Sequence, residues 1–116
     1  MELDTEEAIL IFDKAANYWG IEAQLLTVME ELLELAIACE RLMARGFNHE
    51  NYARLIDETA DVTIMLEQLR RIANNYIGIP DFDARVKERI VFKMNRLAGK
   101  LLTFEKAHPT LIKSDR

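Results

Sequence analysis

Two short acidic motifs constrain this chain more than any other feature of its sequence. The first, EELLE, spans residues 30–34, and the second, ETAD, spans residues 58–61; both lie in strongly helical stretches. Residues at i and i+3 share one helix face, with their Cβ atoms about 5–6 Å apart. Two such pairs on facing helices would form a site for Mg2+, which prefers hard oxygen ligands and which Mn2+ can replace. The predicted ligands are Glu31, Glu34, Glu58 and Asp61.

The second motif lies in the apolar stripe of its helix. At about 100° per residue, five apolar side chains fall within about 80° of Glu58. Glu58 and Asp61 are therefore expected to face a helix interface, where an unpaired charge costs several kcal/mol and a bound cation would offset that cost. The five apolar residues are Leu55, Val62, Met65, Leu66 and Leu69.

The first motif is open to two interpretations. Its helix is apolar around more than half of its circumference, so Glu30, Glu31 and Glu34 occupy the narrow polar face that remains. One interpretation is half of a metal site. The other is a solvated acidic face, in which Glu30 or Glu34 pairs with the nearby Arg41 and Arg45. The two motifs taken together favour the metal site.

The composition is that of an ordinary globular domain. Half of the 116 residues are apolar and 30% are charged, so we expect one domain over residues 1–108 and a polar tail over residues 109–116. The net charge of −5 argues against nucleic-acid binding. No apolar run approaches the ~18 residues of a membrane span and no signal segment is recognisable, so a cytoplasmic protein without membrane contact is expected. Cys39, the only cysteine, excludes an intrachain disulfide and is expected in the core.

Helical periodicity predicts an all-α fold with four helices arranged like a four-helix bundle. The expected helices run to about residue 17, from 21 to 45, from 48 to about 76, and from 81 or 83 to about 107. The second helix carries more apolar surface than so small a unit can cover, which predicts a homo-oligomer. The expected N-caps are Asp4, Asn48 and either Asp81 or Asp83, and the expected breaks are Gly20, Gly46 and Gly78.

A basic row lies on one face of the expected fourth helix. Lys93, Arg96 and Lys100 follow each other at i, i+3 and i+7, with Asn95 nearby. Arg offers a bidentate fork to phosphate oxygens and Lys a mobile point charge, so this row can bind the phosphates of a nucleotide. The alternative is a solvated face opposite the apolar side of the helix, and the row by itself favours that alternative.

Two residues near the first motif are candidates for substrate contacts. Trp19 stands at a helix break and can stack on a nucleobase, although a Trp at a helix junction more often fills a core or an interface. Gln24 shares the helix face of Glu31 and Glu34, which makes it a candidate for lining the same pocket.

The ordered pair of motifs resembles the signature of the MazG-like all-α nucleoside triphosphate pyrophosphohydrolases. This group includes dimeric dUTPases, dCTP pyrophosphatases and phosphoribosyl-ATP pyrophosphohydrolase. The resemblance covers residues 17–105 and rests on EExxE, a spacing of 23 residues, ExxD, the aromatic-Gly entry at residues 18–20 and the later basic helix. The chain differs from some members by having no Tyr within a turn after Asp61 and by having Met65, which concerns the part of the pocket that contacts the base.

The resemblance implies Mg2+-dependent hydrolysis of a nucleoside triphosphate to the monophosphate and pyrophosphate, in housecleaning of the nucleotide pool. It implies that the four predicted ligands bind Mg2+ and that Glu30 orients or deprotonates a water. It assigns the phosphates to basic residues of the late helix, here Lys93 and Arg96, often from a neighbouring subunit. A dimer or tetramer is expected, since members of the family dimerise through their helices.

Two functions of other classes remain open at the level of sequence. In the first, the chain is a non-catalytic helical interaction module whose acids only keep it soluble. In the second, it is a regulator that binds nucleotide or metal without turning nucleotide over. The response of the protein to Mg2+ separates the first from the enzyme, and the release of pyrophosphate separates the second.

Overall fold

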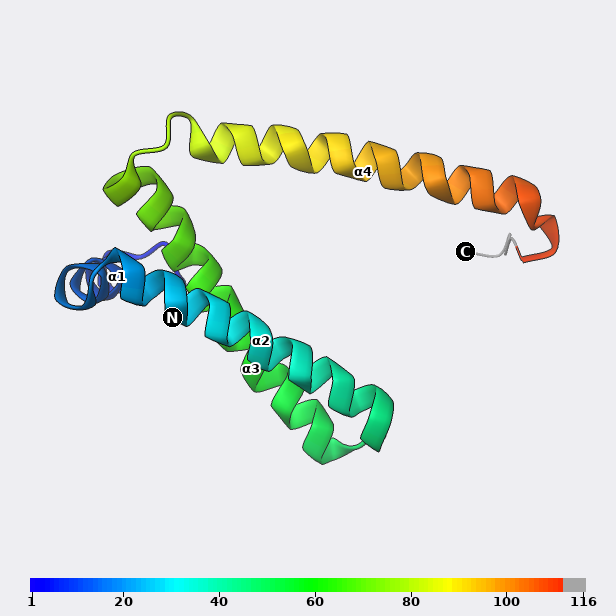
Figure 1. Cartoon of the computed structure of the whole chain (residues 1–116), viewed down its shortest axis with the longest axis horizontal. Helices are drawn as coiled ribbons and strands as arrows, with labels where there is room; N and C mark the ends of the chain where they lie inside the picture. The colour runs from blue at the N-terminus through cyan, green and yellow to red at the C-terminus, as the bar shows by residue number, and fades with distance from the viewer. Residues whose placement is uncertain (112–116) are drawn as a thin grey trace. The chain divides into compact units, whose positions relative to one another are not determined.

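The computed structural model describes residues 1–111, which contain four α-helices (Figure 1). None of these residues forms a β-strand, which confirms the all-α class. None of the described helices combines the length and the apolar character that a bilayer span requires. The elements are α1 (Glu6–Trp19), α2 (Ile21–Arg45), α3 (His49–Arg71), the π-helix η1 (Ile72–Ile77), α4 (Phe82–Ala107) and the 3-10 helix η2 (Pro109–Leu111).

The chain divides into two compact units, residues 1–80 and residues 81–116. The first unit contains α1, α2, α3 and η1, and the second contains α4 and η2. The single domain expected over residues 1–108 and the four-helix bundle stay predictions. Of the polar tail expected over residues 109–116, the part from residue 112 onward lies outside the described residues.

Helices α2 and α3 form an antiparallel hairpin that carries both acidic motifs (Figure 1). Helix α2 ends at Arg45, and its C-cap is Gly46, whose φ of 109° lies in the region that favours glycine. Asn48 caps α3 as predicted, because its Oδ1 accepts a hydrogen bond from the N–H of Asn51 at 3.1 Å. The Nδ2 of Asn51 donates in turn to the carbonyl oxygen of Gly46 at 2.8 Å. These bonds hold the turn, and with it the register in which the two helices meet.

The core of the first unit contains a buried polar network. Gln68 is 1% exposed, and its Nε2 donates to the carbonyl oxygen of Phe12 and to the Oε1 of Gln24, each at 2.9 Å. Side-chain hydrogen bonds therefore join α1, α2 and α3, and a buried amide without such partners would cost about 1–3 kcal/mol. The buried apolar residues are Ala8, Phe12, Ala16, Val28, Ala38, Val62, Ile72 and Ala73.

The third helix departs from the continuous helix to residue 76 that the sequence predicts. The α-helix ends at Arg71, and residues 72–77 form the π-helix η1. The carbonyl oxygen of Ala73 accepts from the N–H groups of Gly78 and of Ile79, the latter at 2.8 Å, and these longer spacings widen the last turn. Gly78 permits this ending because its φ is 74°.

The N-terminal caps of two other helices also differ from expectation. Thr5, and not Asp4, caps α1, because its Oγ1 accepts from the N–H of Ala8 at 3.2 Å. Helix α1 also continues past residue 17 to Trp19 before Gly20 ends it. Asp81 occupies the N-cap position of α4, as one of the two predicted caps, but its side chain makes no capping hydrogen bond.

Candidate metal centre

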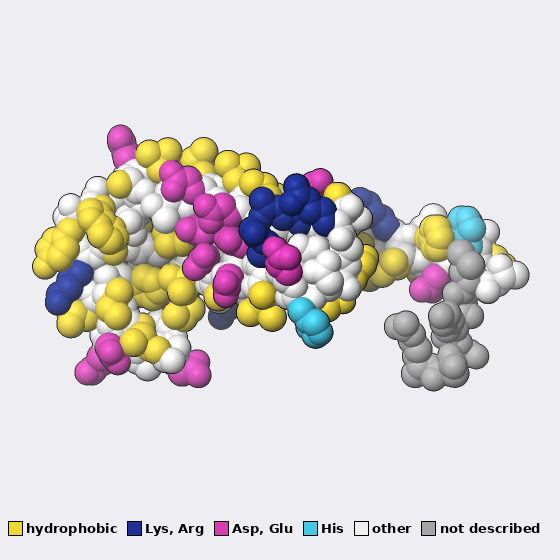
Figure 2. Space-filling model, turned by 90° about the horizontal axis from the view of Figure 1, so that it is seen from below, with side chains coloured by type: hydrophobic (Ala, Val, Ile, Leu, Met, Phe, Trp, Pro, Cys, Tyr) yellow, Lys and Arg dark blue, Asp and Glu magenta, His cyan; other side chains and the backbone are white. Residues whose placement is uncertain are grey.

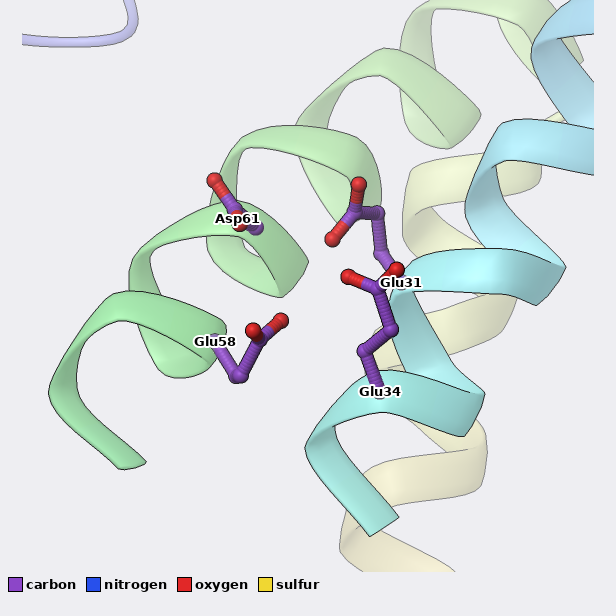
Figure 3. A group of neighbouring side chains, drawn as sticks. All are labelled: Glu31, Glu34, Glu58 and Asp61. Atoms are coloured by element: carbon purple, nitrogen blue, oxygen red, sulfur yellow. The ribbon is translucent and has the colours of Figure 1, made fainter. Parts of the chain in front are cut away.

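The two acidic motifs meet across the α2–α3 hairpin. Glu31 and Glu34 project from α2 toward Glu58 on α3, and Asp61 lies about one turn further along α3 (Figure 3). Each of the four residues offers a carboxylate oxygen that lies within 4.8 Å of the oxygens of the other three. The tertiary structure thus brings together the four ligands that the sequence predicts.

Burial divides the four acids into an inner and an outer pair. Glu31 and Glu58 are half-buried, and the Oε2 atom of each is shielded from solvent without a hydrogen-bond partner among residues 1–111. A carboxylate oxygen that is shielded from solvent without a partner is destabilising, and more so when it is charged. Glu34 and Asp61 are exposed, so one side of the cluster is open to water and to a ligand. The inner pair therefore requires a proton or a cation.

Burial and the crowding of negative charge both raise the pKa of the inner carboxyl groups, Glu31 and Glu58. For Glu31 the largest cause is burial, followed by the charges of Asp61, Glu34 and Glu58. For Glu58 burial again comes first, followed by the charge and close approach of Glu34. Without a cation, the inner pair therefore holds protons at a higher pH than ordinary Glu side chains do.

No basic side chain of the described chain neutralises the cluster. In the first unit, Arg70 pairs with Glu67 at 2.7 Å and Arg71 pairs with Asp13 at 2.8 Å. Within residues 1–111, no Lys or Arg pairs with any of the four clustered acids. The i to i+4 pairing of the first motif with arginines of its own helix, which the sequence left open, is therefore not formed.

The donor set and its spacing fit a small, hard divalent cation. Mg–O distances of about 2.0–2.1 Å place opposite ligands of one ion about 4 Å apart. The four oxygens lie within 4.8 Å of one another, so small side-chain movements would bring them to one ion. The group contains neither His nor Cys, so it lacks the ligands that softer metals favour. The donor set therefore suits a hard divalent cation.

The other predicted site residues are placed in different ways. Glu30 is exposed and lies outside the four-residue group, and Trp19 is 69% exposed at the end of α1. Gln24 is 4% exposed, and its Oε1 accepts the hydrogen bond from Gln68, so this oxygen belongs to the buried hydrogen-bond network of the core. Their contacts with substrate stay predictions. Lys93, Asn95 and Arg96 are exposed on α4, in the second unit.

The pH dependence of stability should differ with and without a divalent cation. Because the folded-state pKa values of Glu31 and Glu58 are raised, their contribution to stability is full below about pH 4.5 and is lost as the pH rises through the raised values. In chelator-treated protein the melting temperature should therefore fall as the pH rises above about 4.5. Millimolar Mg2+ should remove that fall, so its stabilising effect should grow across the same range.

Differential scanning fluorimetry with and without Mg2+ measures both effects. The Glu22→Gln variant is the matched control, since Glu22 is an exposed acid of α2 outside the cluster. It should retain the full response to Mg2+, whereas Glu58→Gln should lose it. If Mg2+ does not change the melting temperature of the unsubstituted protein at pH 7.5, that result would count against the metal centre.

Comparisons of the chain with family models, with curated proteins and with solved structures give no significant match. The membership of the MazG-like group, implied by the motifs, therefore stays a prediction.

Proposed function

We propose that this protein is a Mg2+-dependent nucleoside triphosphate pyrophosphohydrolase that acts in the cytoplasm. The observation that carries the proposal is the convergence of four carboxylates from α2 and α3 within 4.8 Å, two of them with buried and unpartnered oxygens. A structural role gives no reason to gather so much negative charge without a basic partner among residues 1–111. A site that recruits a cation together with a polyphosphate does give one.

In this mechanism the chain contributes positions and charges, and no covalent nucleophile. Glu31, Glu34, Glu58 and Asp61 would hold Mg2+, which when bound offsets the charge of the triphosphate and polarises its phosphoryl oxygens. The exposed carboxylate of Glu30 would accept a proton from the water that attacks the α–β anhydride in line. The bond to the leaving pyrophosphate breaks as the new P–O bond forms, giving the nucleoside monophosphate.

Release of pyrophosphate from a panel of canonical and modified nucleoside triphosphates tests this function directly. The expected result is Mg2+-dependent formation of the monophosphate and pyrophosphate in equal amounts from at least one member of the panel. Mn2+ should replace Mg2+ and excess chelator should stop the reaction. Release of inorganic phosphate instead, or no release from any member, would reject the proposed reaction.

The proposal includes a homo-oligomer with a dimer as its basic unit. On α2, the side opposite Glu31 carries exposed apolar residues at helical spacing, among them Leu26, Met29, Leu33 and Ile37. Cys39 is exposed as well, contrary to the core position expected, because the apolar surface of α2 exceeds what α1 and α3 cover. A large exposed apolar patch of this kind is typical of an interface.

Helix α4 carries a second exposed apolar stripe, and none of its residues is buried. At about 100° per residue, its members fall within about 80° of one another. Lys93 and Lys100 flank one edge of this stripe, so an interface built on it would place the basic row at its border. The stripe consists of Val86, Ile90, Met94, Leu97, Leu101 and Phe104, each 41–58% exposed.

Light scattering coupled to size exclusion should give a mass at least twice the chain mass of 13.4 kDa. Leu97→Glu should shift the protein toward monomer, because it introduces a charge into the stripe. Thr103→Glu places the same charge on the opposite side of α4 and should leave the mass unchanged. A monomer for the unsubstituted protein, or equal effects of the two variants, would contradict this interface.

A further inference from the structure

Two arginines lie between the exposed acids of the metal centre and the α2–α3 turn, one on each helix. Arg41 lies seven residues after Glu34 on α2, and Arg54 lies seven residues before Asp61 on α3. Seven residues make nearly two helical turns, so each arginine falls within about 20° of its acid around the helix axis. Glu34 and Asp61 are the exposed, outer acids of the cluster. The two arginines thus occupy equivalent positions on the facing edges of the hairpin.

The antiparallel register brings Arg41 and Arg54 toward each other. Glu34 and Glu58 belong to the same cluster and so lie at about the same height along the hairpin. At a rise of 1.5 Å per residue, Arg54 lies about 6 Å from Glu58 along α3, and Arg41 lies about 10 Å from Glu34 along α2. Both displacements point toward the α2–α3 turn. The two positions therefore differ by about one helical turn. In Figure 2, Lys and Arg side chains lie directly beside a group of Asp and Glu side chains on one face.

Neither guanidinium is used within the described chain. Among residues 1–111, neither Arg41 nor Arg54 forms an ion pair or a side-chain hydrogen bond, although Glu58 stands four residues after Arg54 on the same helix. Glu58 keeps an unpartnered, buried Oε2 all the same. The two forks are therefore free to bind an external anion.

We infer that Arg41 and Arg54 form a clamp for the part of a polyphosphate chain that extends from the metal centre toward the α2–α3 turn. This inference rests on the proposed function, because the metal centre is what anchors one end of the ligand. A polyphosphate chain carries a negative charge every few ångströms, so successive phosphates can reach both arginines. Each guanidinium group can bind two phosphate oxygens at once. Unlike the basic row of α4, this clamp belongs to the same unit as the acids.

Calorimetric titration with inorganic tripolyphosphate in saturating Mg2+ tests the clamp without requiring turnover. Arg41→Gln and Arg54→Gln should each raise the Kd about tenfold, and the double variant about a hundredfold, since each removes a charge-assisted bidentate contact. The double variant Arg41→Lys and Arg54→Lys retains both positive charges and loses both guanidinium groups. Its Kd should therefore lie between those of the unsubstituted protein and of the double Gln variant. The Mg2+ concentration that gives half of the maximal rise in melting temperature should change less than twofold in each of these variants.

Arg45→Gln is the matched control, because Arg45 lies on the same side of α2 and at the same helix end, one turn further from the acids. It loses the same charge and the same favourable interaction with the helix dipole. Its Kd for tripolyphosphate should rise less than threefold. A double Gln variant that binds no worse than Arg45→Gln would overturn the clamp, and so would an unsubstituted protein that does not bind tripolyphosphate.

The two proposals fail in different ways. Arginine-dependent binding of tripolyphosphate without pyrophosphate release from any nucleotide would reject the enzyme and retain the clamp. Pyrophosphate release with a kcat/KM that the double Gln variant leaves unchanged would retain the enzyme and reject the clamp.

Discussion

Glu58→Gln and Asp61→Asn should each abolish Mg2+-dependent release of pyrophosphate. Each substitution removes one of the four carboxylates that converge within 4.8 Å, and the amide that replaces it is a neutral and weaker ligand. Loss of a direct ligand should cost about a hundredfold or more in kcat/KM, because loss of a residue that merely orients a ligand already costs 10–100-fold. Initial rates at saturating Mg2+ measure this effect.

The same variants should keep their fold, which separates loss of the site from loss of structure. In Mg2+-free buffer at pH 7.5, Glu58→Gln should melt at the same temperature as the unsubstituted protein or higher, since it removes a half-buried charge that only a cation compensates. Glu22→Gln, an exposed α2 acid outside the cluster, should retain full activity. Full activity in Glu58→Gln or in Asp61→Asn would end the proposal of a metal centre.

Arg96→Ala should lower kcat/KM for the triphosphate by about ten- to hundredfold while leaving the Mg2+ dependence of stability nearly unchanged. Loss of a charge-assisted bond to phosphate costs about 1.5–3 kcal/mol, whereas loss of a solvated Arg changes kcat/KM less than twofold. Lys93→Ala should act in the same direction. Lys87→Ala is the control on α4, since Lys87 is exposed on the side of that helix opposite Arg96. If kcat/KM is unchanged in the double Ala variant of Lys93 and Arg96, the basic row is a solvated surface that does not bind the phosphates.

Mixing of inactive variants tests whether the basic row acts on the site of a second copy. Arg96→Ala protein mixed with Glu58→Gln protein should regain part of the activity, because one of the two sites in a mixed dimer would combine intact acids with an intact basic row. Arg96→Ala mixed with Lys93→Ala should regain none if both residues serve the same site from the same chain. Absence of recovery in the first mixture would place row and acids in one chain.

The sequence by itself determined the local structure and the chemistry of the acids. The bounds of α2 follow from an amphipathic run between Gly20 and Gly46, and the start of α3 follows from Asn48, because caps and left-handed glycines act over only a few residues. The i to i+3 spacing likewise predicts the two carboxylate pairs. Local rules predicted Asp4 as the cap of α1, whereas Thr5 is the cap, since neighbouring polar residues can both cap and only the backbone path selects one.

Only the tertiary structure decided what meets across the helices. The register of the α2–α3 hairpin places Glu31 and Glu34 against Glu58 and Asp61, and it depends on the turn bonds of Asn51, which no periodicity reveals. The same register places Arg41 and Arg54 on the turn side of the acids, about one helical turn apart along the hairpin. Burial of Gln24 by Gln68 is equally non-local, because 44 residues separate the partners and a polar side chain gives no signal in its sequence of where it will find a bond. Spacing along one helix predicts which side chains share a face, whereas packing between helices determines which faces share a site.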